Sequence, residues 1–307
     1  MRNTKFLRSI ELLSLRLEAE NRFATARHYR STVRSFRNFL SDSSGNADIG
    51  IKQLNANVLC RYEAWLAMRG VRRNSSSFYM RILRASYNKI VATNTATQLF
   101  SHVYTGIGKT RKRAVNEGVV LKLNELNLEQ SKRLELARDI FLFSYSTIGM
   151  AFVDIAFLRK SDISAGRINY VRRKTGQQMT VKLEAIARNI IKKYAAKNAD
   201  NQRIFPIITS DDAATAYKQY RKALNQYNRN LQKLSELVDD EISISSYTAR
   251  HSWATAARRH NIPLSVISAG MGHTSEKTTL IYLDSIENAE LDKANKEILA
   301  GLSGKNS

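Results

Sequence analysis

The sequence predicts a mainly α-helical protein with a small β-hairpin sheet, divided into two domains. Its 307 residues fit two domains of ordinary size. Only two prolines, Pro206 and Pro263, interrupt the long segments with helical periodicity. Polar and apolar residues alternate on either side of a turn at Lys174-Thr175-Gly176, a pattern that is typical of a β-hairpin.

The first predicted domain covers residues 1–105, and its clearest element is a helix over 26–40. One face of this helix repeats apolar residues at spacings of three and four: Tyr29, Val33, Phe36 and Leu40. A neighbouring stripe repeats arginine: Arg27, Arg30, Arg34 and Arg37. A guanidinium group reaches phosphate with a fixed fork of donors. For an isolated helix a solvated basic face would be favoured, but residues 1–113 carry 21 Lys and Arg against 6 Asp and Glu, so contact with a DNA backbone is favoured here.

A second basic site is expected further along this domain. Arg72 and Arg73 precede three serines that begin at Ser75. A serine N-cap predicts a helix that runs to about Val91. Since helix N-termini attract phosphate, these arginines are candidate DNA contacts.

A basic linker at 106–114 is expected to separate the two domains. Gly106 and Gly108 give it flexibility. The basic residues that follow are further candidate DNA contacts: Lys109, Arg111, Lys112 and Arg113.

The second predicted domain covers 115–290 and consists of helices packed around the hairpin. Its first helix spans about 128–146, and a shorter one lies near 151–158. The two strands are expected at 167–172 and 179–183. Further helices are expected from about 184 and at 211–235, 248–260, 263–271 and 275–284.

The overall charge indicates a polyanionic partner. The chain has 49 Lys and Arg against 27 Asp and Glu, a formal net charge of +22. Nucleic acid is the commonest polyanion in a cell, so DNA or RNA is favoured. Charge alone leaves open a general basic protein or one that binds acidic membranes.

Composition excludes several other classes of protein. An apolar fraction of 43% can build a core, which excludes a disordered tail protein. The single cysteine, Cys60, excludes a disulfide-built secreted domain. Neither a secretory signal nor an apolar run of about 20 residues is visible, so we expect a cytoplasmic location and no membrane partner.

Neither a nucleotide site nor a metal site is predicted. Gly108-Lys109-Thr110 is similar to the end of a phosphate-binding loop, but that motif needs a glycine five positions earlier, where Val103 stands. The five histidines form no HExxH pattern, and one cysteine cannot build a thiolate site. We expect no cofactor, although a metal-dependent nuclease remains a rival interpretation.

The most informative segment is 247–282. It contains, in order, Tyr247, Arg250, His251, His273 and Tyr282. Each residue alone has an ordinary explanation, such as a core tyrosine or a surface arginine. With Lys174 at the hairpin tip, their order and spacing resemble the catalytic domain of the tyrosine site-specific recombinases, the phage integrase family.

The resemblance covers about 115–285. The helical domain before it resembles that family's core-binding, SAM-like domain. The stretches around Arg250 and His273 are most similar to members found in bacterial mobile elements and DNA inversion systems.

The resemblance implies that the protein cuts and rejoins double-stranded DNA, in integration, excision or inversion. Tyr282 would attack phosphorus to form a 3′-phosphotyrosyl bond, and Lys174 would protonate the departing 5′ oxygen. Arg250 would hold the phosphate charge, and His273 would bind the phosphate or help take the tyrosine proton. The resemblance also implies a tetramer on DNA, with the tail 291–307 docked on a neighbouring subunit, and no ATP or metal.

Three positions around this site need comment. Tyr247 stands where the family has a histidine; it can donate a hydrogen bond but cannot act as a base near neutral pH. Asp154 takes the place of the acid in the family's Gly-Leu-Arg-x-x-Glu stretch. Asp154 and His251 are expected to support the catalytic groups.

The third position is Ala151, which stands where that stretch has an arginine. Losing a transition-state donor typically costs about 10²–10³ in rate. Either another cation substitutes, or the chain is a catalytically weak or silent DNA-binding relative. The arginines available by sequence neighbourhood are Arg138, Arg159, Arg172 and Arg173.

Overall fold

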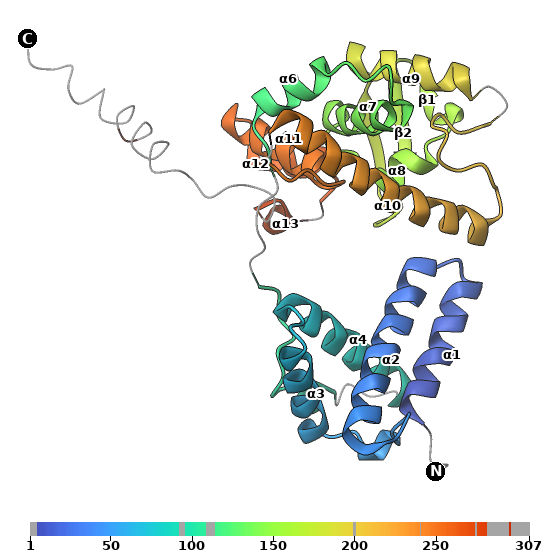
Figure 1. Cartoon of the computed structure of the whole chain (residues 1–307), viewed down its shortest axis with the longest axis vertical. Helices are drawn as coiled ribbons and strands as arrows, with labels where there is room; N and C mark the ends of the chain where they lie inside the picture. Colours follow the sequence, from blue (N-terminus) through green and yellow to red (C-terminus); the bar gives the residue numbers. More distant parts are fainter. Residues whose placement is uncertain are drawn as a thin grey trace, which may run out of the picture. The chain divides into compact units, whose positions relative to one another are not determined.

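The computed structural model describes residues 5–91, 96–108, 114–198, 201–239, 241–273, 275–280 and 295. The chain forms two compact units, Met1–Thr110 and Arg111–Ser307 (Figure 1). Both are built mainly of helices, and the second contains a small antiparallel sheet. The predicted fold class is therefore confirmed. No helix in the described part of the chain is long and apolar enough to cross a membrane.

The first unit packs its helices around an aromatic core. Its longer helices are α1 (Phe6–Ala19), α2 (Phe23–Ser44), α3 (Ala56–Met68) and α4 (Arg73–Val91), and α5 (Ala96–Leu99) is a single turn. Phe36 of α2 and Tyr62 of α3 meet edge to face with ring centroids 4.8 Å apart. The Tyr62 hydroxyl donates a hydrogen bond to Ser35 Oγ at 2.7 Å, so this buried phenol keeps a polar partner.

Two helices of this unit differ from their predicted bounds. The helix expected over 26–40 extends in both directions, and Gly45 ends it in a left-handed conformation (φ 67°). The helix expected after a serine cap begins earlier, at Arg73, because the Arg72 carbonyl accepts the first-turn N–H groups of Ser75 and Ser76. The serine-cap prediction is wrong, since Ser76 lies buried inside the first turn.

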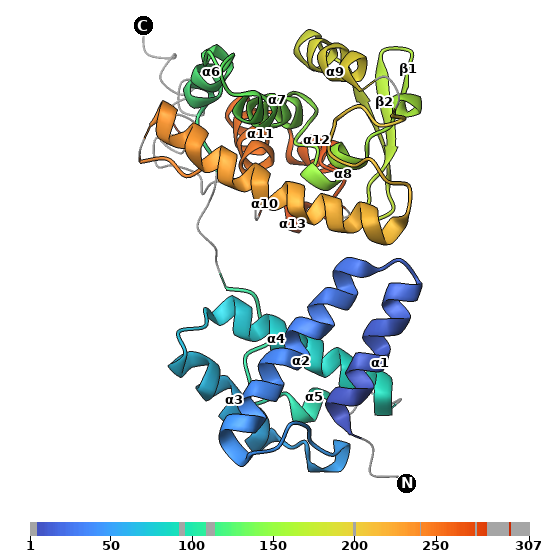
Figure 2. The same cartoon turned by 45° about the vertical axis from the view of Figure 1, so that its right-hand side comes forward.

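The second unit surrounds helix α7 (Lys132–Ser146), whose last two turns are almost wholly buried. The long helix α10 (Ala213–Val238) packs against α7 and against the short helix α8 (Phe152–Phe157) (Figure 2). The remaining helices are α6 (Glu117–Glu125), α9 (Ala185–Lys197), α11 (Thr248–Arg259), α12 (Leu264–Gly270) and α13 (Glu276–Leu280). Helix α6 was not predicted, because the first helix of this domain was expected to begin at about 128. The other bounds lie within a few residues of the predicted helices, except that the end of the helix expected over 275–284 lies outside the described residues.

The sheet has three antiparallel strands in the order β1-β2-β3, within the described chain. The predicted hairpin is present as β2 (Arg167–Val171) and β3 (Gln178–Lys182), with Ile168 opposite Val181 and Tyr170 opposite Met179. These four side chains are buried, as the alternating pattern predicted. The edge strand β1 (Ile163–Ser164) was not predicted, because two residues carry no alternation.

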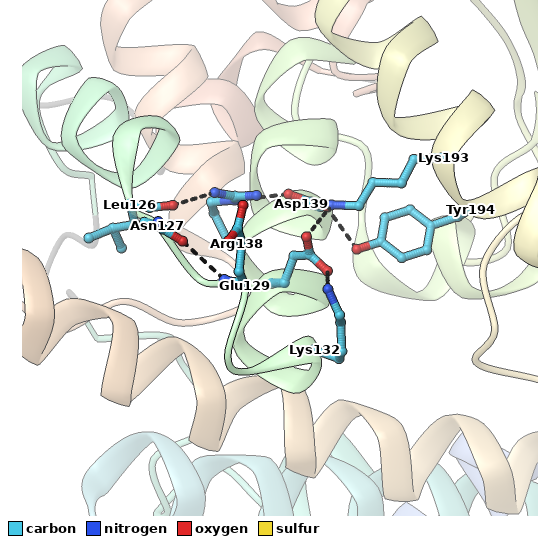
Figure 3. A network of polar contacts seen from close by, with 9 residues as sticks. Leu126, Asn127, Glu129, Lys132, Arg138, Asp139, Lys193 and Tyr194 are labelled. Carbon is cyan, nitrogen blue, oxygen red and sulfur yellow. Dashed lines mark hydrogen bonds and ion pairs between the residues drawn. The ribbon is translucent and has the colours of Figure 1, made fainter.

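A polar network joins α7 to α9 (Figure 3). Buried Asp139 accepts hydrogen bonds from Lys193 Nζ at 2.5 Å and from the Tyr194 hydroxyl at 2.8 Å. Arg138 donates to the same carboxylate at 2.9 Å and to the Leu126 carbonyl at 2.7 Å. Burial, together with the bond to Asp139, raises the pKa of Tyr194. Because each charge has a partner, the network anchors the sheet-side helix α9 to the central helix α7.

Candidate active site

Arg250 lies in the first turn of α11 and is only 4% exposed. Its guanidinium group donates to the Gly149 carbonyl at 2.8 Å and to the Met271 carbonyl. It also lies 3.1 Å from His273 Nε2. One side chain therefore connects α11, the loop after α7 and the turn after α12, and its partner Gly149 lies 101 residues away in the chain.

The loop after α7 is shaped to present the Gly149 carbonyl. The Gly149 N–H donates to the Ser144 carbonyl at 2.8 Å, and both Ile148 (φ 60°) and Gly149 (φ 68°) are left-handed. A Cβ atom on Gly149 would lie 2.8 Å from both Cα and Cγ of Arg250. Glycine is therefore required at 149 both by the backbone conformation and by the approach of Arg250.

His273 is held in one orientation by two contacts. Its Nε2 faces Arg250, and its Nδ1 lies 2.8 Å from Thr279 Oγ1 on α13. Burial, together with the charges of Arg250, Arg172 and Lys174, lowers the pKa of His273 to about 4. The imidazole is therefore neutral at pH 7. Because a guanidinium can only donate, Nε2 accepts from Arg250, which leaves the proton on Nδ1 for Thr279.

The β2–β3 hairpin packs against the turn that carries His273. Arg172, which follows β2, is 6% exposed and donates from Nη1 to the Gly272 carbonyl at 2.5 Å. Gly272 is left-handed (φ 62°), and a Cβ there would lie 2.7 Å from Met179 Sδ on β3. Exposed Lys174 lies in the hairpin turn, near enough for its charge to lower the His273 pKa.

Asp154 on α8 holds the turn of the hairpin. Its Oδ1 accepts the backbone N–H of Arg173 at 2.9 Å. Burial raises the pKa of the Asp154 carboxyl, and the nearby charges of Arg172, Arg173 and Arg250 oppose that rise. Asp154 thus holds the hairpin, and the structure brings it together with Lys174, Arg250 and His273 in one cluster.

Two other predicted residues lie at the edge of this cluster. Tyr247 caps α11 and is 48% exposed, and its hydroxyl lies close enough to influence the pKa of Tyr220 on α10. His251 is half-buried on α11 beside Arg250. Tyr282 lies outside the described residues.

Sequence reasoning missed two contributors to the cluster. Thr279 is fully buried and fixes His273, but the paired threonines at 278 and 279 gave no reason to choose one of them. Gly149 was not among the predicted site residues. Its close approach to Arg250 depends on how α7 and α11 pack, which no local pattern shows.

Comparison with known families agrees with the geometry. Residues 115–288 match the phage integrase family, and residues 5–102 match the phage integrase SAM-like domain. The chain belongs to the phage integrase family. Curated relatives include the tyrosine recombinase XerC of Rickettsia rickettsii (strain Sheila Smith), 24% identical over 266 residues that cover 83% of this chain and 84% of the relative.

Solved structures of integrases share the fold. A lambda integrase dimer bound to a COC′ core site matches with a TM-score of 0.65 at 16% identity, over 92% of this chain and 99% of that chain. The Tn1549 transposon integrase in complex with transposon right end DNA matches with a TM-score of 0.63 at 11% identity, over 97% and 100%.

The arginine stripe on α2 of this integrase divides into two pairs. Arg30 forms an ion pair with Glu18 of α1, and Arg37 forms one with Glu11 at 2.7 Å. Arg27 and Arg34, which lie seven residues apart on the adjacent part of the helix surface, are exposed. Half of the stripe is therefore neutralised within the first unit.

Arg27 lines a groove of about 330 Å³ between α2 and the start of α4. Its other lining residues are polar or aromatic: His28, Ser31, Asn74, Ser75, Phe78 and Tyr79. Asn74 is tied to Gly108 by two hydrogen bonds of 2.8 and 3.1 Å, and Arg73 stacks 3.9 Å over the ring of Tyr104. Arg72 is exposed beside them.

The basic linker residues Lys109, Arg111, Lys112 and Arg113 lie outside the described residues. In the part of the chain that the structure describes, no group of three or more His, Cys, Asp or Glu side chains could hold a metal ion.

Proposed function

We propose that this chain is a tyrosine site-specific recombinase that cuts and rejoins double-stranded DNA through a 3′-phosphotyrosyl intermediate. The observation that supports this most directly is the Arg250–His273 pair, held by backbone carbonyls and by Thr279. Tyr282 follows His273 by nine residues, within the segment that matches the phage integrase family.

Arg250 is the proposed anchor for the scissile phosphate. Negative charge gathers on the non-bridging phosphate oxygens as a nucleophile attacks, and charge-assisted guanidinium bonds stabilise that charge. Because two carbonyls already orient the Arg250 guanidinium, little reorganisation is needed when DNA binds.

Neutral His273 can accept a proton at Nε2. In the free protein its pKa is low because it is buried beside cations. A bound phosphate would offset those positive charges and so raise the His273 pKa. His273 would then bind the phosphate or take the phenol proton as the Tyr282 oxygen attacks phosphorus.

Lys174 is the proposed general acid. When the Tyr282–phosphorus bond forms, the bond from phosphorus to the 5′ oxygen breaks, and Lys174 gives that oxygen a proton to release a 5′-hydroxyl. A 5′-hydroxyl of a second strand can reverse the step, which rejoins DNA in a new combination. Asp154 and His251 would support these groups, and Tyr247 would donate a hydrogen bond where relatives have a histidine.

The first unit is proposed to hold the DNA backbone. Exposed Arg27 and Arg34, with Arg72 and Arg73 at the start of α4, form the described part of this surface, and the linker cations would extend it. A solved relative is a lambda integrase tetramer bound to a Holliday junction. We infer the same assembly here, with residues 291–307 docked on a neighbouring subunit, and a cytoplasmic location where DNA is accessible.

The test is covalent trapping on a nicked substrate that carries the cognate inverted repeats, in excess chelator. The wild-type protein should form a covalent protein–DNA adduct, and Tyr282→Phe should form none while it binds DNA normally. Tyr247→Phe, the matched control, should still form the adduct. Tight binding without an adduct would identify a silent DNA-binding relative, and loss of activity in chelator would indicate a metal-dependent nuclease.

A further inference from the structure

The proposed reaction needs more positive charge at the phosphate than Arg250 supplies. The family places a second arginine three residues before the acid that corresponds to Asp154, but this chain has Ala151 there. Loss of one such donor costs about 10²–10³ in rate. The structure can now distinguish among the four arginines that lie near this position in the sequence.

Two of the four have guanidinium groups engaged elsewhere, and a third is exposed. Arg138 is paired with Asp139 in the α7–α9 network. Arg159 is exposed and its backbone pairs with that of Arg203. The Arg173 guanidinium stacks 3.7 Å over the Phe157 ring.

Arg172 is the one that reaches the cluster. Its Nη1 donates to the Gly272 carbonyl, whereas Arg250 donates to the carbonyl of the preceding residue, Met271. Since consecutive Cα atoms lie about 3.8 Å apart, the two guanidinium groups bind neighbouring points of one turn. Both also lower the pKa of His273, which independently places their charges around the same imidazole.

The surroundings of Arg172 suit an anion. Arg172 is 6% exposed, and within the described chain its side chain donates to one neutral carbonyl. Most of its five N–H donors therefore remain for a ligand. Asp154, a carboxylate whose pKa the charge of Arg172 lowers, accepts the Arg173 backbone N–H, which fixes where Arg172 leaves the strand.

We propose that Arg172 is a catalytic residue: it supplies the second guanidinium on the scissile phosphate, from the end of β2 instead of from position 151. This rests on the proposed recombinase function. Arg172 forms no covalent bond; it neutralises charge on a non-bridging oxygen while Tyr282 attacks.

The test compares two nicked substrates, one with the natural phosphodiester and one with a neutral methylphosphonate at the scissile position. On the phosphodiester, Arg172→Ala should form the covalent adduct about 10²–10³ times more slowly than wild type. On the methylphosphonate, which carries no charge to neutralise, the two proteins should react at similar rates. Arg173→Ala, the neighbouring control, should match wild type on both substrates.

A merely structural Arg172 would give a different result, because Arg172→Ala would then lose activity equally on both substrates. That outcome, or an unimpaired Arg172→Ala, overturns the proposal. If Arg172→Ala unfolds at a lower temperature than wild type, the double variant Ala151→Arg/Arg172→Ala tests the proposal instead. Phosphodiester cleavage regained by the double variant supports the proposal. A folded double variant that does not cleave opposes it. Failure of wild type itself to form an adduct would instead overturn the proposed function.

Discussion

The two arginine-rich regions of this integrase use the same side chain in opposite ways. In the catalytic cluster, Arg250 and Arg172 are almost fully buried and donate to backbone carbonyls. On α2, Arg27 and Arg34 are exposed, and their neighbours Arg30 and Arg37 are paired with glutamates. Buried guanidinium groups act at fixed positions in a low dielectric, whereas exposed ones act through a field that salt screens.

This contrast shows why charge counts alone describe such a protein poorly. A buried cation is costly unless its donors are satisfied. The carbonyls of Gly149, Met271 and Gly272 reduce that cost without cancelling the positive charge. The charge is thereby kept for an anionic ligand.

The largest expected effect comes from displacing Arg250 without changing it. Gly149→Ala forces a Cβ within 2.8 Å of Arg250 and should slow adduct formation by about 10²-fold or more, the cost of one misplaced donor. Gly166→Ala is the matched control, because Gly166 has the same left-handed backbone (φ 71°) with nothing within 4 Å of the added Cβ. Equal losses in the two variants, measured by trapping, would mean that backbone strain alone is responsible.

A smaller loss is expected when His273 loses its anchor. Thr279→Val removes the hydroxyl that lies 2.8 Å from Nδ1 and keeps the shape of the side chain. Adduct formation should slow by about tenfold, the value of one hydrogen bond of roughly 1.4 kcal/mol. The exposed neighbour Thr278 gives the control, because Thr278→Val should form the adduct at the wild-type rate. A comparable loss in Thr278→Val would mean that the effect does not act through His273.

Substitutions of the α2 arginines should change only the affinity for DNA and the salt dependence of that affinity. The double variant Arg27→Ala/Arg34→Ala should reduce the slope of log affinity against log salt by about 2, one for each lost phosphate contact. Arg30→Ala/Arg37→Ala removes the same formal charge but frees two glutamates, and its slope should change less in titrations from low to high salt. Similar slopes for the two pairs would show that pairing with α1 does not distinguish them.

The smallest effect concerns protonation of His273. Its pKa is about 4 in the folded protein, below the ordinary 6.5, so the unfolded chain binds this proton more readily. The stability due to neutral His273 is therefore complete above about pH 6.5 and falls as the pH drops toward 4. Imidazole NMR signals of the free protein, assigned with His273→Asn, should show no titration of His273 between pH 6 and 8; a midpoint in that range would contradict the burial.

Local patterns predicted much of this molecule correctly. Helices α2 and α4 of the first unit, most helices of the second, and the β2–β3 hairpin with its buried alternation follow from periodicities that a chain carries within ten or twenty residues. Helices α1, α3 and α6 were not predicted. The cap of α4 and the strand β1 were missed, because one depends on a backbone carbonyl at Arg72 and the other on pairing with β2.

The sequence by itself determined the fold class, the family and the order of Lys174, Arg250, His273 and Tyr282, because these depend on composition and spacing along the chain. Only the tertiary structure decided which arginine joins Arg250, which threonine holds His273 and which arginines of α2 are neutralised. The contact of Arg172 with Gly272 spans 100 residues, and that of Arg37 with Glu11 joins two helices. Such pairings depend on how elements pack, and no window of sequence contains both partners.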